Sequence, residues 1–201
     1  MTPEERGHPF VAAVLDLAMR SMEGVRERIV PEARGRVLEI GLGTGLNLPY
    51  YRVFSHFVGV EPDPFMRKRA AARAAALGMR LDIVEARAEA LPLADESFDT
   101  VVMTWTLCSV DEPPRVLSEI RRVLRPGGTL LFAEHTRSRF PLAERLQDGL
   151  TPAWARVAGG CHMNRDALRL VREAGFFDVE THAFGRERFT LFPIYGGRAS
   201  R

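Results

Sequence analysis

The sequence is poor in cysteine, and its few cysteines lie far apart in the chain. Its 201 residues contain only Cys108 and Cys161. Two isolated cysteines supply neither the disulfide framework of a small secreted protein nor the clustered ligands of a zinc finger. We therefore expect no metal site, and we expect a protein of a reducing compartment such as the cytoplasm.

Long hydrophobic runs and an excess of one charge are also missing. No apolar stretch approaches the roughly 18 residues of a bilayer-spanning helix, and the opening MTPEERGHPF lacks the cationic and apolar regions of a signal peptide. Lys and Arg number 28 against 26 Asp and Glu, a net charge of +2. This balance argues against a nucleic-acid partner, which favours a basic face. We expect no transmembrane segment and at most weak contact with a membrane surface, and the sequence identifies no protein partner.

What the chain does have is a regular alternation of short β-rich runs with helical stretches. A length of 201 residues suits one α/β domain, and the alternation predicts a parallel sheet covered by helices. No linker or repeat interrupts the pattern, so we expect a single domain over residues 1–201. The predicted strands are 36–40, 57–60, 81–84, 98–103, 129–133, 179–184 and 189–194, the last two forming a hairpin.

Helices are predicted between these strands from apolar residues at helical spacing. One begins after Asp63, a candidate N-cap. A stretch over 141–158 is expected to break at Pro152, and a later helix is expected to have Asn164 as its N-cap. The leading helix, residues 10–30, is amphipathic, and we predict that it is a lid over a ligand site rather than a membrane anchor.

A glycine-rich loop, GLGTG at 41–45, follows the first predicted strand. Glycines allow a sharp turn and the close approach of a ligand. Glu61 ends the second strand 20 residues after Gly41, where a carboxylate can accept bonds from both hydroxyls of a ribose. A dinucleotide site would have glycine in place of Leu46, and Glu39 would repel a pyrophosphate. Because Glu39 would attract the ammonium and sulfonium groups of S-adenosylmethionine, the pattern favours a cationic nucleoside ligand.

With these motifs the sequence resembles the class I S-adenosylmethionine-dependent methyltransferases over nearly its whole length. VLEIGLGTGLN, VGVEPDPFM and RVLRPGGTLLFAEH are similar to the family's first, second and fifth-strand motifs, and EARAEALPLADESFDTVVM to its adenine-edge segment and fourth strand. TLCSV, EH, PAW, GCHMNR and a closing P-x-Y-G are similar to the small thiol-methylating branch, with bacterial phosphatidylethanolamine N-methyltransferases as the nearest competitor. The resemblance implies a Rossmann-like α/β fold: a seven-stranded, mostly parallel sheet of order 3-2-1-4-5-7-6, with the last strand antiparallel and helices on both faces.

The same resemblance implies S-adenosylmethionine as the cofactor and a set of residues that hold it. Many relatives have Asp or Asn where this chain has Arg87. Arginine has no hydrogen-bond acceptor for the adenine amino group, so we expect Arg87 to point to solvent. The residues expected to bind the cofactor are Glu39, Gly41, Gly43, Thr44, Gly45, Asn47, Glu61, Pro62, Met66, Arg87, Ala88, Thr104 and Leu107.

Candidate residues for the chemistry follow the fourth and fifth strands. His135 is the first candidate for a general base, with a structural histidine at the strand end as its alternative. His162 is the second candidate, and its alternative is an ordinary loop residue. Cys108 is expected to be a buried small hydrophobic side chain, and the role of Cys161 is left open. An apolar acceptor pocket is suggested by Trp105, Leu107, Trp154 and Phe192.

The acceptor is expected to be a small molecule that needs little help from a base. A thiol is partly ionised near neutral pH and is intrinsically nucleophilic. We therefore predict methyl transfer to a small, apolar thiol. A phospholipid amine acceptor and a non-catalytic cofactor-binding protein are the alternatives.

Overall fold

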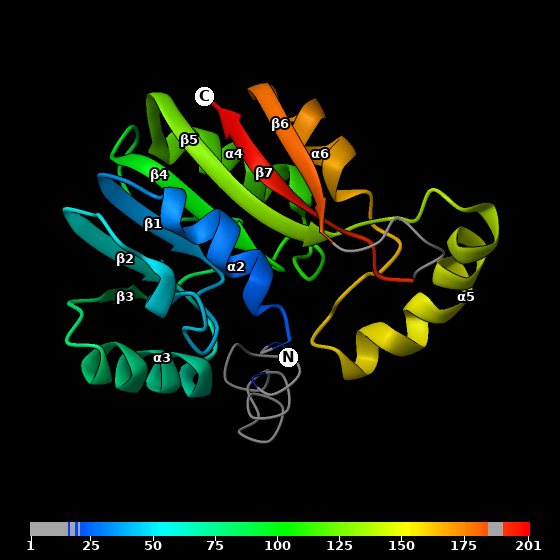
Figure 1. Ribbon diagram of the computed structural model, residues 1–201, viewed down its shortest axis with the longest axis horizontal. Helices are drawn as coiled ribbons and strands as arrows, with labels where there is room; N and C mark the ends of the chain where they lie inside the picture. The colour runs from blue at the N-terminus through cyan, green and yellow to red at the C-terminus, as the bar shows by residue number, and fades with distance from the viewer. Residues whose placement is uncertain (1–15, 17–18, 20, 185–190) are drawn as a thin grey trace.

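The computed structural model describes residues 16, 19, 21–184 and 191–201. Its strands are β1 Arg36–Ile40, β2 His56–Val60, β3 Asp82–Val84, β4 Phe98–Thr104, β5 Leu124–His135, β6 Phe177–Phe184 and β7 Ile194–Ser200. They form one seven-stranded sheet in the order β3-β2-β1-β4-β5-β7-β6 (Figure 1). β7 pairs antiparallel with both β5 and β6, and the pairs from β3 to β5 are parallel. The predicted strand order and its single antiparallel strand are confirmed.

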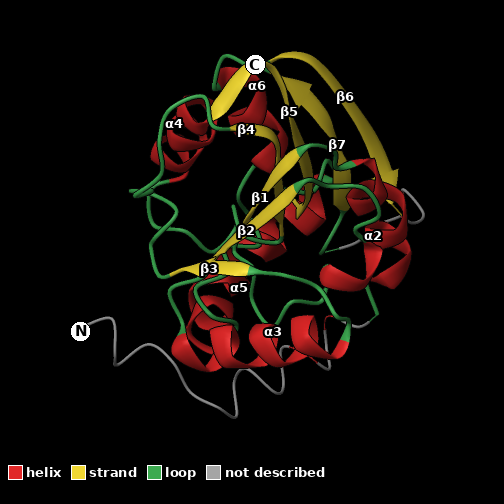
Figure 2. Ribbon diagram, turned by 90° about the vertical axis from the view of Figure 1, so that its left-hand side faces the viewer, coloured by secondary structure: helices red, strands yellow, loops and turns green. Residues whose placement is uncertain are grey.

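Helices cover both faces of the sheet, as Figure 2 shows from the β3 edge. The α-helices are α2 Glu23–Ile29, α3 Pro64–Ala76, α4 Pro113–Val123, α5 Pro141–Val157 and α6 Ala167–Glu173, with 3-10 helices at Val30–Glu32 and Leu48–Tyr50. The apolar faces of α4 and α6 pack into one hydrophobic core, and those of α2 and α3 pack into a second core. In the described part of the chain, none of the helices has the length and apolar character needed to cross a membrane.

The register of the central strands brings the functional loops to one edge of the sheet. Ile40, the last residue of β1, pairs with Val60 at the end of β2 and with Met103 near the end of β4. Parallel strands end at the same edge, and ligands of open α/β sheets bind there. The glycine loop, Glu61 and Thr104 are therefore neighbours in space.

Two predicted helix features are wrong. α5 runs unbroken through Pro152, because the helix loses only the hydrogen bond to the carbonyl of Asp148, a residue exposed to water. α6 is capped by Asp166, whose side chain accepts a hydrogen bond from the backbone N–H of Arg169. The Asn164 side chain, the predicted cap, instead donates to Asp148.

The last strand also lies later than predicted. β7 begins at Ile194, so the predicted range 189–194 meets it at one residue, and positions 189 and 190 lie outside the described residues. Gly196 and Gly197 continue the strand. A Cβ at Gly196 would come within 2.8 Å of the Phe132 carbonyl oxygen, and one at Gly197 would collide with the Glu180 backbone. These glycines therefore allow a close approach of three strands.

The predicted leading helix is described only in part. Much of residues 10–30 lies outside the described residues, and α2 forms its C-terminal end. Val25 and Ile29 of α2 are buried in the second core. This part of the segment belongs to the body of the domain.

Candidate functional site

A deep cavity lies at the carboxyl ends of the strands. Its volume is about 650 Å³, in the range of small-molecule sites. Most of the residues expected to bind the cofactor line it: Glu39, Gly41, Gly43, Thr44, Asn47, Glu61, Pro62, Met66, Arg87, Ala88 and Thr104. The structure thus brings together residues from four separate segments of the sequence.

Gly45 and Leu107 are the two expected cofactor residues that do not line this cavity. A Cβ at Gly45 would lie 2.7 Å from Leu48 Cδ1 and 3.2 Å from Ala70 Cα of α3. Gly45 therefore lets the loop pack against α3. Leu107 is fully buried in the first hydrophobic core, so its side chain stabilises the fold rather than facing a ligand.

Glu39 is the buried acidic group at one end of the cavity. Its Oε1 accepts a hydrogen bond from Asn47 Nδ2 at 2.9 Å, and its Oε2 accepts one from the Tyr51 hydroxyl at 2.9 Å. Burial raises the pKa of Glu39 to about 8, and these two hydrogen bonds only partly oppose that rise. Arg26 supports the cluster by donating from Nε to Asn47 Oδ1 at 3.1 Å. A cation that faces Glu39 would therefore stabilise the ionised form of this buried carboxyl group.

Glu61 lies directly beside the glycine loop. Its Oε2 accepts a hydrogen bond from Gly43 N at 2.8 Å, and its Oε1 accepts one from Asp63 N at 2.9 Å. Each carboxylate oxygen has a further lone pair for a ribose hydroxyl. Gly43 has φ +56°, and a Cβ there would point into open space with only Gly41 O nearby, at 3.9 Å. A ligand can therefore approach the loop backbone at Gly43.

Arg87 is exposed to solvent, as predicted, but two carboxylates hold its guanidinium group. The guanidinium donates to Glu89 Oε1 at 3.1 Å and to Asp111 Oδ2 at 2.6 Å. Two carboxylates compete better than water for a guanidinium because their charges and planar geometry match. Glu89 and Asp111 line the cavity with Arg87. This end of the cavity therefore carries acceptor groups that the sequence analysis missed.

Residues before α2 and one residue within it form part of the cavity wall. Asp16, Met19, Met22 and Arg26 all line it. Asp16 Oδ1 accepts a hydrogen bond of 2.5 Å from the Thr44 hydroxyl of the glycine loop and lies 3.2 Å from Arg73 Nη2. The described part of the N-terminal segment is thus attached to the loop that it covers.

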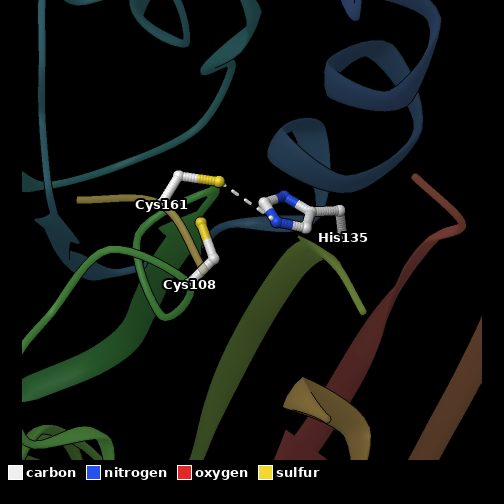
Figure 3. A group of neighbouring side chains, drawn as sticks. All are labelled: Cys108, His135 and Cys161. Atoms are coloured by element: carbon white, nitrogen blue, oxygen red, sulfur yellow. Dashed lines mark hydrogen bonds between the residues drawn. The ribbon is translucent and has the colours of Figure 1, made fainter. Parts of the chain in front are cut away.

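In the wall of the same cavity, the His135 side chain lies beside both cysteines of the chain. Cys108 follows β4, His135 ends β5, and Cys161 follows α5; Figure 3 shows the three side chains pointing toward one another. His135 Nε2 lies 3.3 Å from Cys161 Sγ. All three residues are buried and line the cavity. The expectation that Cys108 is buried is confirmed, but it belongs to a polar cluster rather than to apolar packing alone.

The two thiols have pKa values shifted in opposite directions. A hydrogen bond from Cys108, together with His135 and the Trp154 indole, lowers the pKa of Cys161 to about 4. The same bond to Cys161, with burial, raises the pKa of Cys108 well above its usual value. Trp154 Nε1 donates to Cys161 Sγ at 3.2 Å. Cys161 is therefore the more acidic of the two thiols.

Glu134, which the sequence analysis did not single out, holds the loop that carries Cys108. Its Oε1 accepts hydrogen bonds from the backbone N–H groups of Thr106 and Leu107, at 2.8 and 2.9 Å. Its Oε2 has no hydrogen-bond partner among the described residues. An acidic residue inside a buried strand is the sequence signal that could have identified it.

The aromatic residues expected around the acceptor lie in this cavity, but the second candidate base does not. Trp105, Trp154 and Phe192 line the cavity, and the Trp154 and Phe192 rings lie 5.2 Å apart. His162, the second candidate base, is not among the lining residues; its backbone N–H donates to the Cys108 carbonyl. His162 therefore holds the loop after α5 against the loop after β4.

The comparisons with known proteins agree with this geometry. The methyltransferase domain family matches residues 38–132. Thiol S-methyltransferase TMT1B of Homo sapiens is 32% identical over 185 residues, which are 86% of this chain and 76% of the human protein. Phosphatidylethanolamine N-methyltransferase of Cereibacter sphaeroides is 39% identical over 112 residues, covering 54% of this chain and 55% of that protein.

A solved structure agrees as well. An S-adenosylmethionine-dependent methyltransferase from Thermotoga maritima superposes with a TM-score of 0.67 at 26% identity, covering 94% of this chain and 93% of that chain. The cavity fits the cofactor of these enzymes, because a buried carboxylate can face the cationic methionine end and a second one can face the ribose. On the fold, the site and these similarities together, the chain belongs to the class I methyltransferases, enzymes that use S-adenosylmethionine as cofactor.

Proposed function

We propose that this enzyme methylates a small, apolar thiol. The observation that carries the proposal is one continuous cavity. It runs from Glu39 and Glu61 to an apolar end formed by Trp154 and Phe192, where His135 and Cys161 are the polar groups. Similarity to a human thiol S-methyltransferase over 86% of the chain supports the same acceptor class.

The cofactor would be held by the residues at the glycine-loop end of this cavity. Glu39 would face the ammonium group, the Glu61 carboxylate would accept bonds from the ribose hydroxyls, and the Gly43 backbone would approach the ligand closely. Met66 and Ala88, which also line the cavity, would contact the adenine. When bound, the cofactor supplies a methyl group already activated on a positively charged sulfur.

The chain's own contribution is to orient the acceptor and to exclude water. Good alignment of two reactants can be worth roughly 7–11 kcal/mol, and an acceptor thiolate gains nucleophilicity in a dry cavity. Trp105, Trp154 and Phe192 would enclose the carbon chain of the acceptor. We place His135 at the acceptor end, where its Nε2 and Cys161 Sγ would contact the acceptor sulfur.

The N-terminal segment would close the site, as a lid within the single domain. Asp16 is bonded to the glycine loop through Thr44, and Met19 and Met22 line the cavity. This placement supports a lid rather than a membrane anchor. A reducing compartment such as the cytoplasm would keep Cys108 and Cys161 as the thiols that the site uses.

An acceptor screen tests this proposal. The full chain would be incubated with radiolabelled S-adenosylmethionine and one of a small alkyl thiol, a phenol, a primary amine or phosphatidylethanolamine vesicles. We expect labelled thioether from the alkyl thiol at a rate well above that from the other acceptors. Labelled product from the vesicles with none from any thiol would overturn the thiol proposal.

A phospholipid amine is the second candidate acceptor, and one surface feature favours it. Leu142, Leu146, Leu150 and Trp154 follow one another at helical spacing on α5 and are all exposed, Leu142 by 63%. An exposed apolar stripe on an amphipathic helix can contact a lipid surface. Sedimentation of the protein with phosphatidylethanolamine vesicles, together with methylated lipid, would support this second candidate.

A further inference from the structure

The cluster of Cys108, His135 and Cys161 has the composition of a metal site. One nitrogen and two sulfur ligand atoms lie within 4.8 Å of one another. In a tetrahedral zinc site with Zn–S bonds of about 2.3 Å, two sulfur ligands lie about 3.8 Å apart. The three side chains therefore need to move by less than about 1 Å to meet one metal ion. Sulfur with imidazole nitrogen is a soft ligand set, which selects zinc over magnesium or calcium.

The surroundings of the cluster resemble the outer shell of a metal site. Trp154 Nε1 donates to Cys161 Sγ, and the His135 ring makes a further hydrogen bond with the backbone at His162. Such partners orient the ligands and strengthen metal binding. Glu134 fixes the loop that carries Cys108, and its Oε2 has no hydrogen-bond partner in the part of the chain that the structure describes.

The charges near the cluster also suit a divalent cation. Arg165 interacts electrostatically with Cys108, Cys161 and Glu134, and its Nη1 donates to the Leu107 carbonyl at 2.6 Å. Two thiolates and the Glu134 carboxylate would be balanced by a divalent ion together with Arg165. Without the ion, a second thiolate in this buried site would be strongly unfavourable.

The cluster offers three protein ligands, and its fourth side faces the cavity. Closed structural zinc sites have four protein ligands, whereas catalytic zinc sites have three and keep one position for water or substrate. All three residues line the same cavity as Glu39, Trp154 and Phe192. A ligand in the fourth position would therefore lie where the proposed acceptor binds.

We propose that Cys108, His135 and Cys161 bind a zinc ion whose fourth position takes the sulfur of the acceptor thiol. This inference rests on the proposed function for the identity of the fourth ligand, but not for the metal site itself. On coordination, the acceptor S–H bond breaks, a zinc–sulfur bond forms, the displaced water leaves, and the proton passes to solvent. His135 then acts as a metal ligand rather than as a general base, and the metal keeps the acceptor as a thiolate at neutral pH.

Cobalt binding tests the site without depending on activity. The full chain, purified without a polyhistidine tag, would be stripped with a chelator and titrated with Co²⁺ under anaerobic conditions. We expect one equivalent of Co²⁺ to bind, with a thiolate-to-cobalt charge-transfer band and the intense visible bands of tetrahedral cobalt. Zinc should displace the cobalt and abolish both signals. Failure of the unmodified chain to bind either metal stoichiometrically would overturn the proposal.

Single substitutions assign the ligands. Cys108→Ser, Cys161→Ser and His135→Asn should each weaken metal binding by more than about 100-fold, the upper range for loss of an outer-shell partner. His56→Asn is the matched control, because His56 lies at the start of β2, outside the residues that line the cavity. Unchanged cobalt spectra in both cysteine variants would contradict the assignment, and circular dichroism would report whether each variant is folded.

The fourth position is tested by adding a small alkyl thiol to the cobalt-loaded protein. We expect a stronger charge-transfer band and shifted visible bands as a third thiolate joins the metal. A cobalt spectrum that the thiol leaves unchanged would overturn the open fourth position. Cobalt bound by these ligands with no thiol methylated would refute the proposed function alone. Thiol turnover by metal-free protein that binds no cobalt would refute only the metal site.

Discussion

The buried carboxyl group of Glu39 makes cofactor binding dependent on pH. Its pKa of about 8 means that, without ligand, it is mostly protonated at neutral pH. An ammonium group facing Glu39 would favour the ionised form, so binding must remove a proton. The substitution that tests this is Glu39→Gln, which keeps the size of the side chain and its contacts with Asn47 and Tyr51 but cannot ionise.

The size of the effect follows from the distance between the working pH and this pKa. Each pH unit below about 8 adds about 1.4 kcal/mol to the cost of ionising Glu39, which is tenfold in the dissociation constant. From pH 7.5 to 5.5 the affinity for S-adenosylmethionine should therefore fall on the order of 100-fold. An α-amino group has a pKa of about 7.7–8.0, so the ligand remains mostly cationic in this range.

Isothermal titration calorimetry measures both the affinity and the proton. The unmodified chain would be titrated with S-adenosylmethionine across this pH range in buffers of different ionisation enthalpy. We expect nearly one proton released per ligand at pH 6.5. Glu39→Gln should bind more weakly at pH 7.5, show little pH dependence and release no proton. Glu32→Gln, which changes an exposed carboxylate, is the matched control. An unchanged pH dependence in Glu39→Gln would refute the reasoning.

Four further predictions concern the same end of the molecule. In ligand-free protein, the raised pKa of Glu39 means that the folded state holds a proton that the unfolded state has lost. The free energy of unfolding should therefore fall as the pH rises from about 4.5 to 8. Urea titration of Glu39→Gln should show no such fall in the free energy of unfolding. Glu61→Ala should weaken cofactor binding roughly 10- to 150-fold, since charged hydrogen bonds contribute ~1.5–3 kcal/mol; an unchanged dissociation constant would show that Glu61 does not hold the ribose. Gly43→Ala should lower both the stability of the fold and the affinity for the cofactor. Gly78→Ala is the control, because Gly78 has a similar φ and open space around it; it should lower stability by about 1–2 kcal/mol and leave the affinity unchanged. Equal affinities in the two variants would contradict the close approach of the cofactor to the Gly43 backbone. Deletion of residues 1–21, which spares α2, should weaken cofactor binding about tenfold through loss of the Asp16 contacts, and full affinity in the truncated chain would argue against a lid.

The strand order and one end of the cavity were predictable from the sequence because their signals are local or follow a fixed topology. Glu39, the glycine loop and Glu61 lie within about two dozen residues. Parallel strands that pair with one another end at the same edge. A strand, a glycine turn and an acid at the next strand end are thus enough to place the carboxylates beside the loop, and the register of Ile40 with Val60 confirms that arrangement.

Where the sequence analysis was wrong, a local signal was outweighed by neighbours distant in the chain. By strand propensity, Gly196 and Gly197 are expected to end a strand. Their lack of side chains instead lets β7 approach β5 and β6 closely. Pro152 breaks a helix by the general rule, but its one lost hydrogen bond falls on an exposed turn of α5. Packing therefore determines where β7 ends, and exposure to solvent allows α5 to continue; intrinsic propensity alone predicts neither.

The cluster of Cys108, His135 and Cys161 was decided by tertiary structure alone. β4 and β5 are neighbours in the sheet, which brings Cys108 near His135, but only the packing of the loop after α5 adds Cys161. The hydrogen bond from His162 to the Cys108 carbonyl holds that loop in place. The sequence determined that the chain has two cysteines. Whether they are separate core residues or neighbours in one cluster depends on how the segments after β4, at the end of β5 and after α5 pack together. No local pattern of residues predicts that packing.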